Sequence, residues 1–343
     1  MTSSYWRKDS GTRRSPRGRR CVVRAAVLSA FGALLLCVPS ASLQAKLCGD
    51  DVEGRDIPCD CGDTVVSSVV LSDDPVAERE CPSDGLIVRG AQPGGGLTVD
   101  LDGKKLRGSG TGAGIWIISG GESGARLLGG SGGATISGFR DGILASGVEP
   151  VAMIRDVIVR NCTRDGLRVG GTRYRIEDVE SYSSGRDGFS LGGSDFTVVS
   201  SQAVSSGRFG YLITGRNGTV GRNEEALNRA TLSGTTGFSL LGSGHRLVGC
   251  EALHNGRDGV ALRGAQHHII SCRAEHNLGS GITGTGSAWL LRANSTRANR
   301  NDGLVVRGAA LVDGGGNRGS ENLGELSQRA AVQCEIGGAP CQR

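Results

Sequence analysis

Residues 164–169 read Arg-Asp-Gly-Leu-Arg-Val, residues 186–191 read Arg-Asp-Gly-Phe-Ser-Leu, and residues 257–262 read Arg-Asp-Gly-Val-Ala-Leu. The shared feature is a glycine followed by one apolar or aromatic residue. It occurs eight times, and successive glycine numbers differ by 24, 22, 22, 27, 22, 22 and 22. A constant period of this size predicts a solenoid of stacked repeats. The eight pairs are Gly142-Ile143, Gly166-Leu167, Gly188-Phe189, Gly210-Tyr211, Gly237-Phe238, Gly259-Val260, Gly281-Ile282 and Gly303-Leu304.

The pattern inside each repeat indicates which solenoid this is. Two positions after the apolar residue stands a second apolar or small residue, and the residue between them varies in character. This alternation is typical of a short strand with one inward face. Ten residues after the glycine a second apolar column appears, at Ile176, Val198, Leu247, Ile269 and Leu291. The Leu-x-x-Leu-x-Leu spacing of leucine-rich repeats is missing. We therefore predict an all-β fold, a single-stranded right-handed parallel β-helix.

The first 45 residues have the composition of a secretory signal peptide. Six arginines between residues 13 and 24 precede a 14-residue apolar run, Ala25–Val38, and small residues lead to Ala45. The run is short for a membrane span, and Cys37 follows three leucines, which argues against a lipid anchor. We expect an exported protein, secreted or in the periplasm or outer envelope, without a stable membrane span after cleavage.

Removing this leader changes the charge balance. It contains eight basic residues and one acidic residue, so 31 Lys and Arg remain against 33 Asp and Glu, a formal net charge of −2. The basic character of the whole chain thus comes mostly from the leader. Nothing in this balance supports nucleic-acid binding. The 59 glycines and few aromatic residues are typical of a solenoid with tight corners.

Nine cysteines follow the leader, and an exported protein tends to oxidise those whose geometry allows it. The preferred pairs are Cys48 with Cys59, Cys61 with Cys81, and Cys334 with Cys341. Cys250 and Cys272 are 22 residues apart and should lie on adjacent coils, as a disulfide or as two buried thiols. We expect Cys162 to be an inert residue of the core or of a turn.

The repeats divide the chain into four parts. Residues 1–45 are the signal peptide and residues 46–84 an N-terminal cap. Residues 85–313 form the β-helix, and residues 314–343 a disulfide-closed C-terminal cap or tail. Caps are expected because the open end of a β-helix exposes unpaired backbone groups that promote aggregation.

This layout resembles the exported right-handed parallel β-helix repeat proteins of bacteria, which share their coil with pectate lyases, alginate epimerases and periplasmic NosD-like proteins. The resemblance rests on the Asp-Gly-apolar units and covers nearly all of the chain after the leader. It implies the fold, whereas the repeat itself encodes no chemistry. The other segments that carry it are Cys61-Gly-Asp-Thr-Val65, Cys81-Pro-Ser-Asp-Gly-Leu86, Val99–Leu106, and Asp313–Asn317 with Cys334 and Cys341.

Stacked repeats would turn two sequence positions into charged columns. Aspartates directly precede the marker glycine in five repeats, and arginines precede it by two residues. Such an arginine column could hold the carboxylates of a uronic-acid polymer. The alternative, which we favour, is a solvated stripe of surface ion pairs. The arginines are Arg140, Arg164, Arg186, Arg208 and Arg257, and the aspartates are Asp141, Asp165, Asp187, Asp258 and Asp302.

Asp156 and Asp178 are also 22 residues apart, with Glu177 and Glu180 beside the second. Two stacked carboxylates could bind Ca²⁺, the only cofactor that the sequence suggests. The resemblance to pectate lyases implies a use for such a site, in which Ca²⁺ neutralises a uronate and an arginine removes the adjacent proton. The chain departs from these families, since it has neither a lyase signature around Asp156 nor the Asp-Pro-His-Asp stretch of the epimerases. Solvated acids on an outer face are the preferred interpretation.

Three further features could contribute to a site. His254-Asn255 and His276-Asn277 repeat at 22 residues and Asn299 continues the column, which predicts stacked, hydrogen-bonded asparagines. The five extra residues of the long repeat fall in 216–228, a predicted surface bulge. Trp116, which alternates outward between Ile115 and Ile117, could stack on a sugar or pack under the cap.

These observations favour a non-catalytic exported protein that binds glycans or other cell-surface components. The alternative is a polysaccharide lyase or epimerase acting on uronic-acid polymers. It would need a base beside an acidic cation site, and the candidates are Asp156, Asp178, Arg186 and Arg208. The candidate ligand-binding residues are Trp116, Arg164, Arg186, Arg208 and Arg257.

Overall fold

The structure is a computed structural model that describes residues 46–90, 96–120, 124–147, 151–222, 227–323 and 332–341. All of them belong to one compact unit, Leu43–Arg343. The predicted signal peptide, residues 1–45, lies outside the described residues. No helix within the described ranges is long and apolar enough to span a membrane.

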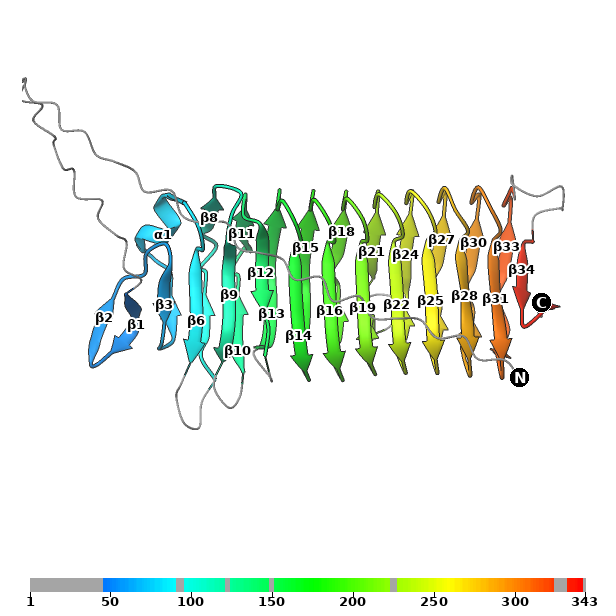
Figure 1. Ribbon diagram of the computed structural model, residues 1–343, viewed down its shortest axis with the longest axis horizontal. Coiled ribbons are helices and arrows are strands. Elements are labelled where there is room, and N and C mark those ends of the chain that lie inside the picture. The colour runs from blue at the N-terminus through cyan, green and yellow to red at the C-terminus, as the bar shows by residue number, and fades with distance from the viewer. Residues whose placement is uncertain are drawn as a thin grey trace, which may run out of the picture. The chain divides into compact units, whose positions relative to one another are not determined.

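Two parallel sheets carry the coils, as the successive arrows from β3 to β34 show (Figure 1). We call them sheet 1 and sheet 2. Apart from the short helix α1 (Pro75–Glu78), the described elements are strands. Sheet 1 contains β1 (Leu47–Val52), β2 (Arg55–Ile57), β3 (Asp63–Val65), β6 (Leu86–Gly90), β9 (Ala113–Gly120), β12 (Asp141–Ala145), β14 (Leu167–Thr172), β16 (Phe189–Ser194), β19 (Tyr211–Arg216), β22 (Phe238–Ser243), β25 (Val260–Ala265), β28 (Ile282–Ser287), β31 (Leu304–Ala309), β34 (Cys334–Ile336) and β35 (Ala339–Pro340).

Sheet 2 takes one long strand or two short strands from each coil. It contains β4 (Val69–Val70), β5 (Glu80–Cys81), β7 (Thr98–Asp100), β8 (Lys105–Gly108), β10 (Ala125–Leu128), β11 (Ala134–Ser137), β13 (Val151–Arg160), β15 (Arg175–Tyr182), β17 (Thr197–Val199), β18 (Gln202–Val204), β20 (Thr219–Val220), β21 (Asn228–Thr231), β23 (Arg246–Val248), β24 (Cys250–Leu253), β26 (His268–Ile270), β27 (Arg273–Glu275), β29 (Leu290–Arg292), β30 (Ser295–Arg297), β32 (Val312–Asp313) and β33 (Arg318–Ser320).

The strand register confirms the predicted repeat. In sheet 1, Leu167 pairs with Phe189, which pairs with Tyr211, and Tyr211 pairs with Phe238 across the long interval. The chain advances by one coil at each step, so equivalent residues lie on adjacent parallel strands. The fold is therefore the predicted parallel β-helix.

Close packing at one corner explains the marker glycine. A Cβ atom at Gly166 would lie 2.0 Å from the Ser181 hydroxyl oxygen, and one at Gly210 would lie 2.6 Å from the Ala230 Cβ. These separations are far below van der Waals contact. The backbone of sheet 1 thus begins so close to sheet 2 that no side chain fits between them.

The inward columns form the core. The residue after each marker glycine is buried in all eight repeats, as is the predicted second column from Ile176 to Leu291. Larger side chains stack within these columns, with ring centroids of Phe189, Tyr211 and Phe238 4.5 and 4.6 Å apart. Stacked rings add to the stabilisation that comes from burying their apolar area.

A second stack of rings was not predicted. Tyr174 lies on Phe196, with ring centroids 4.9 Å apart, and His245 lies on His267 at 5.3 Å. Both imidazoles are buried. The Nδ1 atom of His245 accepts from the Gly218 amide, and its Nε2 donates to the Leu241 carbonyl. These partners fix a neutral tautomer inside the core.

The predicted asparagine column is confirmed. Asn255 Nδ2 donates to Asn277 Oδ1, Asn277 Nδ2 to Asn299 Oδ1, and Asn299 Nδ2 to Asn322 Oδ1, over 2.8–2.9 Å. At the end of the column Gln333 supplies the next carbonyl oxygen, 2.9 Å from Asn322 Nδ2. Each buried amide is therefore satisfied by its neighbour in the next coil.

Parallel pairing between coils extends beyond residues 85–313 at both ends. Asp63 already pairs with Leu86, and Cys81 with Gly108, so a coil lies within the proposed cap 46–84. At the other end Ser295 pairs with Arg318, beyond the predicted end at 313. Short and irregular strands hide the repeat in both regions. The residues that close sheet 1 are the antiparallel hairpins β1–β2 and β34–β35.

The three predicted disulfides are confirmed. Cys48–Cys59, Cys61–Cys81 and Cys334–Cys341 are bonded, and they tie down the two ends of the β-helix. Cys162, Cys250 and Cys272 are buried free thiols. Of the two alternatives for Cys250 and Cys272, the structure shows stacked thiols rather than a disulfide.

Candidate functional site

The predicted arginine and aspartate columns form an interlocked ladder over residues 140–208. The guanidinium groups of Arg164, Arg186 and Arg208 each bind the aspartate of the preceding coil, whereas Arg140 contacts Asp141 of its own coil. Arg164 donates from Nε and Nη2 to the two oxygens of Asp141 over 2.7 and 2.6 Å. Arg208 holds Asp187 in the same way, at 2.8 and 2.6 Å, and Arg186 holds Asp165. Bidentate contacts of this kind are strong and directional.

The prediction of a solvated stripe is wrong for three of the five aspartates, whereas Asp258 and Asp302 are partly exposed. Asp141, Asp165 and Asp187 have no exposed surface. Burial raises the pKa of the Asp165 carboxyl, and the Arg186 guanidinium opposes that change. Sequence spacing shows that the columns are adjacent, but it does not show that one lies beneath the other. The arginines therefore serve to neutralise buried carboxylates.

The ladder is broken in the second half of the β-helix. The coil before Arg257 has Thr236, not an aspartate, directly before its marker glycine. Arg257 therefore has no carboxylate at the ladder position of that coil, and its side chain is exposed. The coil after Asp258 has Gly279 at the position where the ladder has an arginine. Asp258 therefore has no arginine partner from that coil, and its Oδ1 accepts a hydrogen bond from the Ser280 amide. Binding of an external ligand by Arg257 stays a prediction.

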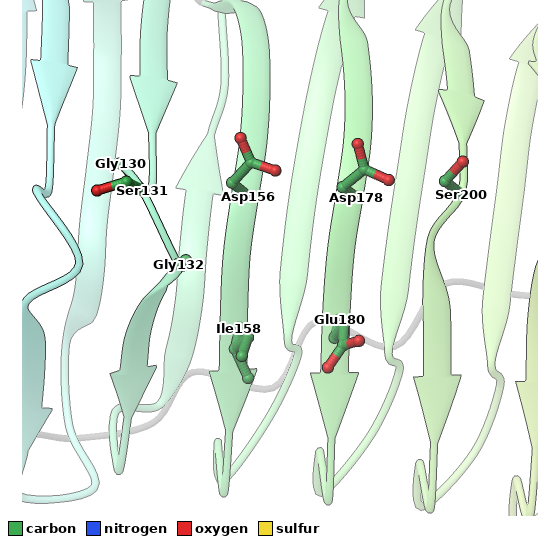
Figure 2. Close-up of a pocket in the computed structure, with 9 residues that line it drawn as sticks. Gly130, Ser131, Gly132, Asp156, Ile158, Asp178, Glu180 and Ser200 are labelled. Atoms are coloured by element: carbon green, nitrogen blue, oxygen red, sulfur yellow. The ribbon is translucent and has the colours of Figure 1, made fainter.

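Asp156 and Asp178 do lie together, on the outer face of sheet 2. Their side chains project in the same direction from β13 and β15, beside a glycine-rich turn (Figure 2). They line an open pocket of about 430 Å³ with Glu180. Its other lining residues are Gly130, Ser131, Gly132, Gly133, Ile158 and Ser200.

The backbone presents both aspartates in an unusual conformation. Their φ angles are 56° at Asp156 and 50° at Asp178, the left-handed region that aspartate tolerates better than most residues. Partial burial raises the pKa of Asp178, and the nearby Asp156 carboxylate raises it further. The Arg155 guanidinium donates to Asp156 over 3.0 Å. The pocket is acidic, although one of its carboxylates is partly neutralised.

Glu180 is fixed by its neighbours. Tyr182 donates to one of its oxygens over 2.8 Å, and Gln202 Nε2 donates to the other over 2.8 Å. Among the described residues, no group of three or more His, Cys, Asp or Glu side chains could hold a metal ion. The Ca²⁺ site suggested for Asp156 and Asp178 thus has no third acidic ligand within the described ranges, and it stays a prediction.

The structure does not bring the four predicted catalytic candidates together. Asp156 and Asp178 share the pocket on sheet 2, whereas Arg186 and Arg208 are bound to the buried aspartates before sheet 1. Neither arginine lines the pocket. Neither of the two candidate arginines therefore lies beside the two aspartates; the arginine that does is Arg155, which is paired with Asp156.

The remaining candidates are dispersed. Trp116 is half-buried on the outer face of sheet 1, in register with Ile87 and Leu144, and its Nε1 is buried without a partner. The rings of His254 and His276 are exposed and stacked 5.0 Å apart. Residues 223–226 of the predicted bulge lie outside the described residues. Sugar stacking by Trp116 stays a prediction.

A second hollow, which the sequence reasoning missed, lies on the outer face of sheet 1. It has a volume of about 260 Å³ and crosses β25, β28 and β31. Arg263, Thr283, Thr285 and Arg307 line it, together with Asp258. Its signal in the sequence is a change of the outward residues in the last three repeats, where threonines and arginines stand at equivalent positions.

The fold defines this chain as a parallel β-helix protein. No protein-family model matches its sequence, and no curated protein matches it. Among solved structures, the chain is similar to the A-module of the mannuronan C-5 epimerase AlgE4 of Azotobacter vinelandii. The match has 16% sequence identity and a TM-score of 0.38, and it covers 68% of this chain and 72% of that chain.

Proposed function

We propose that this protein is an exported, non-catalytic β-helix protein that binds a glycan of the cell envelope or its surroundings. The observation that supports this function best is the open pocket around Asp156 and Asp178. It lies on rigid strands, and its polar groups are held in place by the backbone ladder. Three disulfides in the described chain fit an oxidising compartment.

The chemistry of the pocket favours a neutral glycan that is rich in hydroxyl groups. Carboxylates are hydrogen-bond acceptors, and sugar hydroxyls are donors that can satisfy them. Both oxygens of Glu180 are already engaged, so Asp156 and Asp178 are the acceptors that face the ligand. A uronate polymer would bring further negative charge to an acidic pocket that no arginine lines.

The lyase or epimerase alternative has one observation in its favour. The raised pKa of Asp178 is the change that a proton-transferring carboxyl needs. Against it stands the engagement of Arg186 and Arg208 elsewhere. Formation of unsaturated or epimerised uronate by the wild-type protein, lost in Asp178→Asn, would establish the enzymatic function and contradict ours.

Glycan-array binding followed by calorimetry tests the proposal. Neutral oligosaccharides should bind, and Asp156→Asn with Asp178→Asn should weaken the best ligand by about tenfold, since charged hydrogen bonds are replaced by neutral ones. Asparagine also tolerates the left-handed backbone, so the fold is kept.

The matched control is Asp195→Asn. Asp195 is exposed, has a φ of 58° and lies outside the pocket, so this variant makes the same chemical change in the same backbone conformation. It should leave affinity unchanged. The proposed function fails if the wild type binds no neutral glycan, or if the control loses as much affinity as the pocket variant.

A further inference from the structure

The hollow on the outer face of sheet 1 has a charge opposite to that of the acidic pocket. In the strand register, Arg263 on β25 pairs with Thr285 on β28, which pairs with Arg307 on β31. The same strands place Ala261, Thr283 and Val305 in the neighbouring row. Two arginines therefore flank the short hydroxyl side chain of Thr285. The backbones of the two arginines are two strand spacings apart, which is about 10 Å.

These arginines differ from those of the ladder in what they contact. The ladder guanidinium groups are bound to buried aspartates, as at Arg164, Arg186 and Arg208. Within the described ranges Arg263 makes no ion pair, and the exposed Arg307 has one loose contact, 3.8 Å from Glu335. Their hydrogen-bonding capacity is thus available to a ligand, and a planar guanidinium suits an oxyanion.

The charged residues of the hollow do not include Arg257, although this arginine is adjacent in sequence to the lining residue Asp258. Asp258 is the one acidic residue among the lining residues, and its Oδ1 accepts from the Ser280 amide. The lining thus combines two cations, two threonine hydroxyls and one hydrogen-bond acceptor.

We infer that this hollow is a binding site for an acidic glycan, with a carboxylate or sulfate group held between Arg263 and Arg307. The hydroxyls of Thr283 and Thr285 and the carboxylate of Asp258 then contact the sugar hydroxyls. This site is independent of the proposed neutral-glycan pocket, because it lies on the other sheet and recognises an anionic group instead of a neutral ligand.

Calorimetric titration of the purified protein with short galacturonate and sulfated oligosaccharides tests the inference. Comparing the carboxylated with the sulfated oligosaccharides identifies which acidic group the site binds. Arg263→Gln with Arg307→Gln should weaken binding at least tenfold, and binding by the wild type should weaken as salt concentration rises. Neutral oligosaccharides of equal length should show no dependence on these two arginines.

The matched control is Arg126→Gln with Arg246→Gln, two exposed arginines on sheet 2 that change the net charge equally. It should keep acidic-glycan affinity within twofold, and Asp178→Asn should do so too. The inference is overturned if neither acidic glycan binds the wild type. It is also overturned if the control loses as much affinity as the arginine variant, which would indicate unspecific charge attraction.

Discussion

At the scale of single residues, the same Arg-Asp-Gly unit has two different roles. At Arg164, Arg186 and Arg208, an aspartate in the preceding coil is buried beneath the arginine and paired with it. At Arg257 the preceding coil has Thr236, and the guanidinium is exposed. The role of each arginine is therefore set by the neighbouring coil and not by its own repeat.

Replacing Arg186 tests whether its partner Asp165 is buried as a charged group. Arg186→Ala removes the bidentate partner of Asp165 and leaves this buried carboxylate with only the weaker ion-pair contact to Arg164 Nε, 3.7 Å away. We expect the free energy of unfolding to fall by about 2–4 kcal/mol, since breaking a buried pair costs far more than breaking an exposed one. Urea denaturation monitored by circular dichroism measures the change.

Arg257→Ala is the matched control for this prediction. It removes the same side chain from the same turn position without exposing a buried charge, so its effect should stay within about 0.5 kcal/mol. Adding Asp165→Asn to Arg186→Ala should recover part of the loss, because a neutral amide costs less to bury than a charge. Equal effects of the two alanine variants would contradict a buried ladder.

At the scale of elements, stability comes from columns of like residues. Asparagines, aromatic rings and histidines each repeat at equivalent positions of adjacent coils, and neighbours within a column contact each other. The column that contains His245 and His267 combines such stacking with titratable groups. Burial lowers the pKa of both imidazoles below its ordinary value of 6.5.

This lowering predicts a loss of stability at acidic pH. As pH falls through 6.5, the unfolded chain binds protons at these two positions before the folded chain does. Their contribution to the free energy of unfolding is therefore complete above pH 6.5 and declines below it, by up to about 1.4 kcal/mol per pH unit for each histidine. Denaturation midpoints measured between pH 8 and pH 5 give the slope.

The variant His267→Asn separates this effect from that of the carboxylates. It removes one of the two titrating groups. The dependence of the free energy of unfolding on pH below 6.5 should therefore weaken by up to about 1.4 kcal/mol per pH unit. The carboxyl groups of Asp50, Asp74, Asp165 and Asp178 have raised pKa values and oppose the slope equally in both proteins. An unchanged slope would show that His267 is not a source of it.

At the scale of the whole molecule, cysteines have separate roles at the ends and in the middle. The six at the ends form disulfides around the closing hairpins and first coil, where few neighbouring coils contribute contacts. The three in the middle are free thiols packed in the core. Burial raises the pKa of Cys162 to about 12 and that of Cys250 well above its ordinary value.

Thiol labelling under non-reducing conditions should follow this division. Folded protein cleaved after residue 45 should react at none of the three thiols, because they are inaccessible and protonated. Denaturation without a reductant should then expose three reactive thiols in each chain. Mass spectrometry counts the added labels. A count of one would indicate a disulfide between Cys250 and Cys272, contrary to the structure.

The sequence by itself determined the fold and the period, whereas it offered the disulfides only as preferred pairs. In a β-helix each residue contacts its equivalent about 22 residues away, so a constant spacing in the sequence is also a constant neighbour in space. This is why the inward columns and the asparagine stack could be predicted. The ends of the β-helix could not be predicted as well, since their short strands lack the full pattern.

Only the tertiary structure decided which charged residues are available to a ligand. Spacing places Arg186 near Asp165, but the depth of Asp165 depends on how the corner of one coil packs under the next. Likewise, the rows that contain Arg263, Thr285 and Arg307 become a hollow through the relative size of side chains on three separate strands. Burial and concavity are properties of several coils together, so no single repeat encodes them.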